Sequence, residues 1–228
     1  MGVEDLFVPP ELRQAIMEGV SKESGTVKAP PRTSILDTGS VLEAGTIDQL
    51  KSQWGDCVRC ALHKTRSHLV LGEGNPKARL VFVGEGPGAE EDKAGRPFVG
   101  KAGQLLTDII EKGFKLKRSD VYITNVVKCR PPENRNPLPE EIKTCMPLLW
   151  KQLEIIDPDI ICALGKIAAQ ALLGSNEPIS VLRGQFQKVR NYVVMPTYHP
   201  AYLLRSPVKK RETWEDVKAI LKAFSSLK

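Results

Sequence analysis

The sequence has no long hydrophobic run. A helix that crosses a membrane needs about 20 consecutive apolar residues, and no segment of the 228-residue chain approaches that length. The first ten residues are acidic and are interrupted by Pro9 and Pro10, which is unlike the pattern of a secretory signal. These absences predict a cytoplasmic protein with no membrane partner.

Two common nucleotide-binding motifs are also missing. Residues 84–88 read GEGPG, a glycine-rich segment of the kind that can cradle a ligand through backbone N–H groups. This GEGPG loop has neither the G-K-[ST] ending of a P-loop nor the G-x-G-x-x-G spacing of a dinucleotide-binding fold. Taken alone, it is either an ordinary turn or a ligand-binding loop of another kind.

Charge gives only a broad indication of the partner. The chain has 33 Lys and Arg residues against 27 Asp and Glu, for a formal net charge of +6. An excess of this sign favours an anionic partner such as nucleic acid, although many basic proteins bind none.

The chain divides near residue 45. Residues 1–45 contain two Pro-Pro pairs and a Ser-, Gly- and Thr-rich middle, and they predict a flexible N-terminal extension. Residues 11–20 are the one stretch of it that could form a short helix. Residues 46–228 show dense hydrophobic periodicity and predict a folded domain.

The folded part alternates apolar strands with amphipathic helices. The predicted strands are residues 80–83, 121–124, 160–165 and 192–195, and the predicted helices are 47–54, 103–113, 139–156, 166–173 and 214–224. This alternation predicts an α/β fold in which helices cover both faces of a parallel sheet. Sites in such folds lie at the carboxyl ends of strands. The GEGPG loop, Asn125 and His199 follow predicted strands, so we expect them to share one site.

Five cysteines are present, an odd number that argues against a disulfide framework in a reducing compartment. Cys57 and Cys60 form a C-x2-C pair that Cys129 and Cys145 follow. Four thiolates suit either a zinc ion or an iron–sulfur cubane; the alternative is that Cys129 and Cys145 are incidental buried thiols. Cys129 lies in a polar, turn-forming segment, which favours the metal site. Cys162 lies inside a predicted strand and is interpreted as a small buried hydrophobic residue.

Acidic and aromatic residues follow the GEGPG loop. Glu90, Glu91 and Asp92 form an acidic triplet, in which a carboxylate could orient a water molecule or stabilise a cationic transition state. Phe98 stands in the glycine-flanked segment GRPFVG at residues 95–100, the GRPFVG loop. It is either a core residue or a platform on which a base stacks.

Four motifs and four cysteines occur together in the order of a known family. The motifs are GEGPG at 84–88, GRPFVGKAG at 95–103, TNVVKCR at 124–130 and the pair His199 and Pro200. In this combination the chain resembles the family 4 uracil-DNA glycosylases, the iron–sulfur branch of their superfamily, from about residue 49 to residue 224. The resemblance implies a three-layer α/β/α fold with a four-stranded parallel sheet. It also implies flipping of uracil out of DNA and hydrolysis of its N-glycosidic bond, which leaves an abasic site for base excision repair.

The resemblance further implies a cofactor and a partner. A 4Fe–4S cluster with a structural role would be held by Cys57, Cys60, Cys129 and Cys145. The expected partner is uracil-containing DNA, single- or double-stranded, and the expected enzyme is a monofunctional monomer. Two rival interpretations are a zinc-holding nucleic-acid module without catalysis and an iron–sulfur protein that transfers electrons.

Three residues would carry the reaction by the same resemblance. Glu85 would position the attacking water, with Glu91 as a second acidic residue implicated in activity. His199 would stabilise the negative charge on the departing uracil, as an oxyanion-hole-type donor; the alternative is that it caps a helix or turn. One branch of the superfamily traps its product through a histidine-bearing insertion. No histidine lies between Gly88 and Asn125, so that chemistry is not expected.

Four residues would bind the base: Gly86 against the uracil, Phe98 stacked on it, Asn125 at its Watson–Crick edge, and Asn134 at a further position tied to activity. The amide of an asparagine offers a donor and an acceptor, which match O4 and N3–H of uracil. Cytosine presents the reverse pattern, which costs about 1–3 kcal/mol for each lost hydrogen bond. Thymine differs by a methyl group, so its exclusion must be steric.

Two leucines and a cation follow His199. Leu203, Leu204 and Arg205 could fill the gap that a flipped nucleotide leaves in a duplex, and we predict them as a DNA wedge. Ordinary core packing explains either leucine almost as well.

Overall fold

The computed structural model of the chain describes residues 43–55 and 57–225. The predicted N-terminal extension, residues 1–45, lies almost entirely outside the described residues, as does the short helix expected at residues 11–20. Among the helices of the described part, none is both long and apolar enough to cross a membrane.

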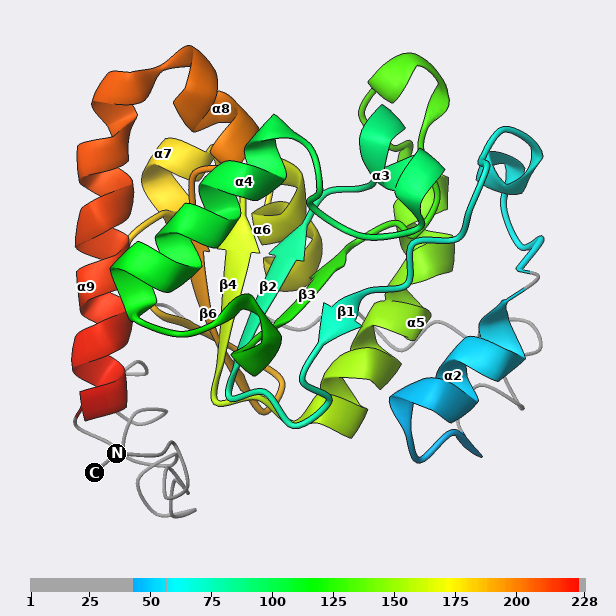
Figure 1. Cartoon of the computed structure of the whole chain (residues 1–228), viewed down its shortest axis with the longest axis horizontal. Helices are drawn as coiled ribbons and strands as arrows, with labels where there is room; N and C mark the ends of the chain where they lie inside the picture. Colours follow the sequence, from blue (N-terminus) through cyan, green and yellow to red (C-terminus); the bar gives the residue numbers. More distant parts are fainter. Residues whose placement is uncertain (1–42, 56, 226–228) are drawn as a thin grey trace.

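A six-stranded sheet forms the middle of the domain (Figure 1). Its strands lie in the order β1 (Glu73–Gly74), β3 (Tyr122–Asn125), β2 (Leu80–Gly84), β4 (Ile160–Leu164), β6 (Tyr192–Thr197) and β5 (Gln187–Val189). The four inner strands are parallel to one another, and β1 and β5 run antiparallel to their neighbours. The predicted α/β fold with parallel strands is present, but the expected count of four strands is not confirmed. The outer strands have only 2 and 3 residues, too few to show a hydrophobic period.

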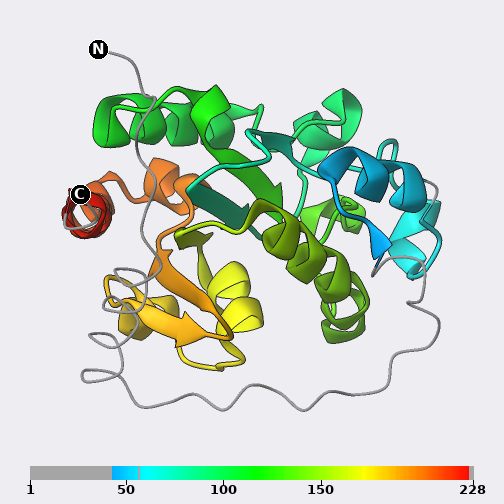
Figure 2. The ribbon, with the colours of Figure 1, turned by 90° about the horizontal axis from the view of Figure 1, so that it is seen from below.

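Helices cover both faces of the sheet, which gives three layers (Figure 2). On one face lie α4 (Lys101–Asp108), the π-helical turn η3 (Ile109–Phe114) and α9 (Lys210–Ser225), and on the other lie α5 (Pro139–Ile156) and α6 (Lys166–Leu173). The remaining helices are α2 (Ile47–Trp54), α3 (Ala89–Ala94), α7 (Ile179–Leu182) and α8 (Pro200–Arg205), with 3-10 turns η2 (Ala61–Lys64), η4 (Arg118–Asp120), η5 (Pro132–Asn134) and η6 (Pro207–Lys209).

Strand β2 shows why the central strands read as unbroken apolar runs. Leu80 and Phe82 belong to the buried cluster under α4 and α9, whereas Val81 and Val83 belong to the cluster under α5 and α6. Successive side chains of a strand point to opposite faces, and helices cover both faces, so every position is buried. Burying a side chain of this size contributes about 1.5–3 kcal/mol. Cys162 on β4 is 2% exposed, as predicted for a core residue.

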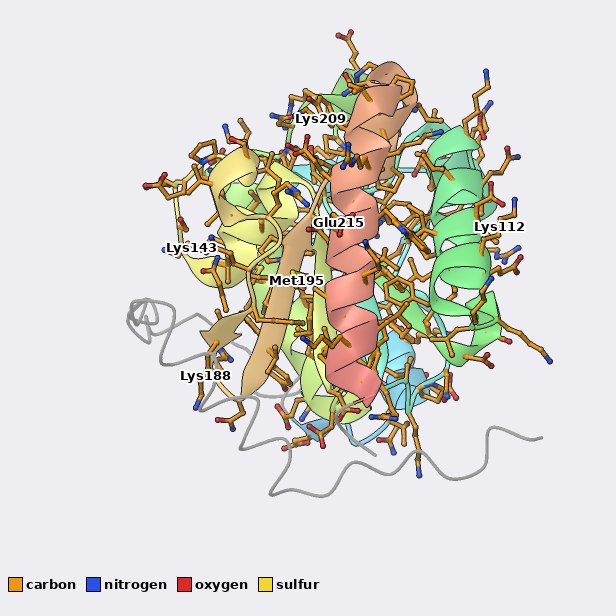
Figure 3. The ribbon with its side chains drawn as sticks, turned by 90° about the vertical axis from the view of Figure 1, so that its left-hand side faces the viewer. Lys112, Lys143, Lys188, Met195, Lys209 and Glu215 are labelled. Carbon is orange, nitrogen blue, oxygen red and sulfur yellow. The ribbon has the colours of Figure 1, made fainter. Side chains whose placement is uncertain are left out.

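Two helices differ from their predictions. The helix expected at residues 103–113 is observed as α4 followed by the π-helical turn η3. The helix changes from α to the wider π geometry at Ile109 and ends at Lys115, which has φ +60°. Helix α9 begins at Lys210, four residues before the predicted start at residue 214, since the charged first turn carries no hydrophobic period. Figure 3 shows α9 lying over β6, where Met195 shares a buried cluster with Val217 and Ile220.

Candidate active site

A cavity of about 500 Å³ opens at the carboxyl ends of β2, β3 and β6. Its walls come from the GEGPG loop, α3, the GRPFVG loop, residues 131–136 and α8, near the top of Figure 1. We call it the substrate cavity. It is lined by all of the residues predicted for catalysis or base binding, namely Glu85, Gly86, Glu91, Phe98, Asn125, Asn134 and His199. The structure therefore brings them together from six separate segments, while their individual roles stay predictions.

Asn125 is the last residue of β3 and pairs in register with Gly84 at the end of β2. A Cβ atom at Gly84 would collide with the Asn125 Oδ1 atom and with the Phe98 ring, so only glycine allows these two side chains their positions. Asn125 is 1% exposed, and its Oδ1 atom has no hydrogen-bond partner within the described part of the chain. A buried polar atom without a partner is uncommon and costs free energy. Its position in the cavity wall makes it available to a donor on a ligand.

Glu91 joins the two glycine-rich loops. Its carboxylate accepts hydrogen bonds from the backbone N–H groups of Gly88 at 3.1 Å and of Val99 and Gly100 at 3.0 Å each. Both of its oxygens are thus engaged in fixing the GEGPG loop against the GRPFVG loop.

Glu85 is in the opposite situation. It is half-buried in the cavity wall, and no described group donates a hydrogen bond to its carboxylate. Burial raises the pKa of Glu85 above the usual value of a glutamate. Of the two acidic residues, Glu85 is therefore the one with free oxygen atoms for a water molecule.

Phe98 has a strained backbone, with φ +52° in a region that non-glycine residues seldom adopt. Its neighbour Pro97 is held by Arg118, whose Nη2 atom donates to the Pro97 carbonyl at 2.7 Å. A Cβ atom at Gly103 would collide with the Phe98 carbonyl, so α4 also depends on glycine there. The Phe98 ring lies with its centroid 5.5 Å from that of His199, on the wall of the cavity.

His199 precedes α8 and caps it. Its Nδ1 atom accepts a hydrogen bond of 3.1 Å from the backbone N–H of Ala201. Burial and the nearby Arg205 lower the pKa of His199 to about 4, so the ring is neutral at physiological pH. Because Nδ1 is an acceptor, the single ring proton lies on Nε2. The predicted cap and the predicted donor are thus two atoms of the same side chain.

Asn134 and the predicted wedge residues differ in exposure. Asn134 is exposed, has φ +57°, and accepts a hydrogen bond of 2.8 Å from Arg130 Nε. Of the predicted wedge, Leu204 is 44% exposed and Arg205 lines the cavity, whereas Leu203 is 1% exposed. Core packing explains Leu203, so the wedge prediction is restricted to Leu204 and Arg205.

A second, much smaller cavity contains the predicted metal ligands, and we call it the cysteine cavity. It is lined by Cys57, Cys60, Cys129 and Cys145, with Arg66 and Lys128 beside them. Arg66 Nη1 donates to Cys129 Sγ at 3.1 Å and to the Cys57 carbonyl at 2.8 Å, and so joins two distant segments.

Burial disfavours the charged thiolate form of these cysteines. Burial raises the pKa of Cys145 to about 12, and burial also raises the pKa of Cys60 and Cys129. Among the described residues, no three His, Cys, Asp or Glu side chains converge in a way that would hold a single metal ion. Four cysteines line one cavity nevertheless, and a set of sulfur ligands alone is the kind of donor set that iron–sulfur clusters use.

Comparisons with known proteins agree on the family. The uracil DNA glycosylase superfamily matches residues 71–218. A Type-4 uracil-DNA glycosylase from Thermotoga maritima is 52% identical over 152 residues, which are 66% of this chain and 79% of the relative. One from Archaeoglobus fulgidus is 44% identical over 183 residues, 77% of this chain and 92% of the relative. A Type-5 uracil-DNA glycosylase from Thermus thermophilus is 37% identical over 120 residues, 46% of this chain and 53% of the relative. The chain belongs to the type-4 uracil-DNA glycosylases.

Some residues that shape the cavity of this type-4 glycosylase escaped the sequence analysis. Arg118 fixes the backbone beside Phe98 and is itself held by Glu73 Oε1 at 2.8 Å, although Glu73 lies on a strand too short to predict. Lys128 belongs to the TNVVKCR motif, but the motif does not predict its buried contacts. The partners of Arg118 are distant in sequence and are brought together only by the fold. Those of Lys128 are three and four residues away, but nothing in the sequence shows that its side chain turns back toward them.

Proposed function

We propose that this uracil-DNA glycosylase hydrolyses the N-glycosidic bond of uracil in DNA and leaves an abasic site, as the first step of base excision repair. The observation that carries the proposal is the substrate cavity, which combines an unpartnered Asn125 Oδ1 atom, a neutral His199 and an unengaged Glu85 carboxylate.

Asn125 supports the choice of uracil. Its Oδ1 atom would accept N3–H of uracil, and its amide group would donate to O4. Cytosine has no proton on N3 and carries an amino group at C4, so both contacts would be lost. Thymine would have to be excluded by shape, and Gly84, Phe98 and Asn125 are already in close contact at the base of the cavity.

The position of the cavity supports base flipping. Asn125 is 1% exposed, so a base still stacked in a duplex would be out of its reach. A nucleotide rotated out of the helix could enter the cavity of about 500 Å³ and lie against Phe98. Arg205 lines the cavity, its neighbour in sequence Leu204 is exposed, and the two would occupy the gap left in the DNA.

His199 would act on the departing uracil, and Glu85 on the sugar and the attacking water. When the C1′–N1 bond breaks, its electron pair leaves with uracil, and negative charge develops on O2 and O4. With O4 facing Asn125, O2 is the oxygen left for the Nε2–H of His199, a contact that in comparable sites is worth about 3–4 kcal/mol. Glu85 would face the cationic sugar and orient the water that adds to C1′, and the proton released by that water would pass to the carboxylate or to solvent.

Glu91 is proposed to position the GEGPG and GRPFVG loops and not the water, because its oxygens accept hydrogen bonds from backbone N–H groups of these loops. The described residues that line the cavity include no lysine that could attack C1′ as an amine. This supports a monofunctional glycosylase that uses water. We further propose that the enzyme acts as a monomer.

The cysteine cavity is proposed to hold a 4Fe–4S cluster through Cys57, Cys60, Cys129 and Cys145. When bound, the cluster would cross-link these segments and so order the loop that follows Asn125. The protein would then be brown, with a broad absorbance band near about 400 nm and about four iron atoms per chain. A colourless protein that contains one zinc ion would contradict this assignment.

DNA is proposed to cross the opening of the substrate cavity. Lys210 and Arg211 are exposed at the start of α9, close in sequence to Arg205, and would contact phosphates together with Arg130. A cytoplasmic location stays a prediction.

One experiment tests this function. Single- and double-stranded oligonucleotides that carry one uracil are incubated with cluster-containing protein and then treated with alkali, which cuts at abasic sites. We expect cleavage at the uracil, and a drop of at least about 100-fold in the single-turnover rate for Asn125→Ala with iron content unchanged. Absence of cleavage by the unaltered protein would overturn the proposal, and a normal rate for Asn125→Ala would overturn the base-reading role.

A further inference from the structure

Lys128 lies between the substrate cavity and the cysteine cavity and is completely buried, with an exposed fraction of 0%. It immediately precedes Cys129 and lines the cysteine cavity. Its side chain turns back toward β3, where its Nζ atom donates to Thr124 Oγ1 at 2.7 Å and to the backbone carbonyl of Asn125 at 2.5 Å. A single lysine thus contacts the residue that we propose to read the base.

The ammonium group has an unusual set of partners. In the part of the chain that the structure describes, its hydrogen bonds go to a hydroxyl and a carbonyl, and no carboxylate forms an ion pair with it. Removing a charged ammonium group from water costs several kcal/mol, which neutral acceptors compensate only in part. Burial accordingly lowers the pKa of Lys128 to about 7. A methionine of similar length would fill the same space without that cost. The fold therefore retains the lysine for a purpose other than packing.

The contacts of Lys128 continue into a buried network. Thr124 Oγ1 donates to the Leu71 carbonyl at 2.8 Å, and Gln152 Nε2 of α5 donates to the same carbonyl at 2.9 Å. The backbone is held as well, because the Lys128 carbonyl accepts a hydrogen bond of 2.8 Å from Val70 N–H. The backbone and the Nζ atom of Lys128 are therefore both held by hydrogen bonds, so Lys128 can restrain the Asn125 carbonyl that it contacts.

The backbone of Lys128 also reaches the cysteine cavity. Burial raises the pKa of the Cys145 thiol on α5, and the backbone N–H of Lys128 has a smaller effect that lowers it. The same residue therefore borders Cys145 in the cysteine cavity and bonds to Asn125 through its side chain.

We propose that Lys128 is a positioning residue for base recognition, one that holds the Asn125 amide in register and ties it to the cysteine cavity. The inference rests on the proposed function. The hydrogen bond to the Asn125 carbonyl fixes the peptide that follows Asn125, and with it the direction of the Cα–Cβ bond. Without this bond the carbonyl is buried and unpaired, and the peptide rotates to seek another donor. The amide then no longer faces the uracil edge, although it is still present.

The proposal predicts a particular kinetic signature. Lys128 is buried and cannot contact DNA, so its loss should leave the KM for the DNA substrate unchanged. The interaction that it supports matters most as the bond breaks, so kcat should fall by about 100-fold, the effect of a small misplacement of a catalytic group.

The test uses the full-length, cluster-containing protein. Lys128→Met is compared with the unaltered protein and with Lys151→Met, which removes another lysine that is 7% exposed but lies on α5 away from the substrate cavity. For each protein, iron content, the absorbance band near about 400 nm, circular dichroism, KM and kcat are measured. We expect Lys151→Met to keep its kcat, and Lys128→Met to keep its iron and its KM while losing about 100-fold in kcat.

A second variant keeps the proposal testable if Lys128→Met does not fold. Lys128→Gln is neutral but retains a donor that can reach the Asn125 carbonyl. We expect its kcat to lie between those of Lys128→Met and the unaltered protein. If Lys128→Met does not fold, we expect the kcat of Lys128→Gln to lie within about tenfold of that of the unaltered protein. The inference is overturned if a folded Lys128→Met cuts uracil at the normal rate, or if Lys128→Gln is folded and inactive. It is likewise overturned if the loss lies entirely in KM. Failure of the unaltered protein to release uracil would instead contradict the proposed function.

Discussion

The substrate cavity and the cysteine cavity lie on either side of the segment from Asn125 to Cys129, yet their chemistry is opposite. The substrate cavity has a volume of about 500 Å³. In its wall lie Asn125, whose buried Oδ1 atom has no partner among the described residues, and Phe98, whose backbone has φ +52°. The cysteine cavity is small, is lined by sulfur atoms, and has the Arg66 guanidinium bonded to Cys129 Sγ.

The difference indicates what each region is for. Backbone strain and unpaired polar atoms destabilise a fold, and they are retained where a ligand uses them. If residues 57, 60, 129 and 145 hold the proposed cluster, its bonds would instead restrict the chain and stabilise it. Changes in the substrate cavity should therefore reduce activity and leave stability intact, whereas changes in the cysteine cavity should reduce stability first.

The largest effect on activity is expected for His199→Ala. Loss of the Nε2–H donor should lower kcat by about 100- to 1,000-fold, because charge on the departing base is no longer stabilised. Iron content and the free energy of unfolding should change little. His68→Ala removes an exposed histidine outside the cavity and should keep full activity. Equal losses in the two variants would remove the basis for assigning a role to His199.

Glu85→Gln should lower kcat by about 100-fold, as expected when a water-orienting carboxylate is lost. The exposed Glu111→Gln serves as the matched control and should be unaffected. If Glu85→Gln were as active as the control while Glu91→Gln were inactive and still folded, the two acidic residues would have to exchange roles.

Acid should inactivate the enzyme through Glu85 before it affects His199. Burial raises the pKa of Glu85 above its usual value, so the required carboxylate is lost as the pH falls through that raised pKa. The pKa of His199 is about 4, so the ring is still neutral in this range. A single-turnover pH profile should show this acid limb in the unaltered protein and none in Glu85→Gln. An acid limb of the same shape in both proteins would assign it to another group.

A substitution in the cysteine cavity should reduce stability before it reduces activity. Cys145→Ala should lose iron and more than about 3 kcal/mol of unfolding free energy, since metal binding and folding are coupled. Its activity should fall as the folded fraction falls and as the loop after Asn125 loses its order, so the loss of stability should come first. Cys162→Ala, which changes a core cysteine on β4, should keep its iron and lose about 1 kcal/mol. An iron-free Cys145→Ala protein of normal stability would show that the two cavities do not differ in this way.

The smallest effect is expected at the rim. Leu204→Ala should slow uracil release from duplex DNA by roughly three- to tenfold and leave single-stranded substrate unaffected, because only a duplex has a gap to fill. Val208→Ala removes another exposed side chain, 79% exposed, and should change neither rate. Equal slowing on single strands would exclude a wedge.

Much of the fold was predictable because its signals are local. Helices α5 and α6 begin and end at the predicted residues, since the proline at the start of α5 and the glycines that flank α6 mark their ends. The outer strands β1 and β5 were missed because 2 and 3 residues carry no period. Leu203 and Leu204 were indistinguishable in sequence, and only the packing of α8 buries one and exposes the other.

In the site, too, only features with a local sequence signal were predictable. Motifs predicted which residues line the substrate cavity, but not what each one does there. The engaged carboxylate of Glu91, the free one of Glu85 and the proton on Nε2 of His199 depend on backbone N–H groups that no motif specifies. The hydrogen bonds from Lys128 to the Asn125 carbonyl and from Arg118 to the Pro97 carbonyl are likewise specified by no motif.

The central claim is that the unpartnered amide of Asn125 reads uracil while His199 faces its departing oxygen. A crystal structure of the cluster-containing protein with uracil bound tests it most directly. We predict that uracil N3 lies within hydrogen-bond distance of Asn125 Oδ1, and O2 within that distance of His199 Nε2, with Ala201 N–H still bonded to Nδ1. A structure in which uracil occupies the substrate cavity while Asn125 Oδ1 stays unpartnered would contradict the claim.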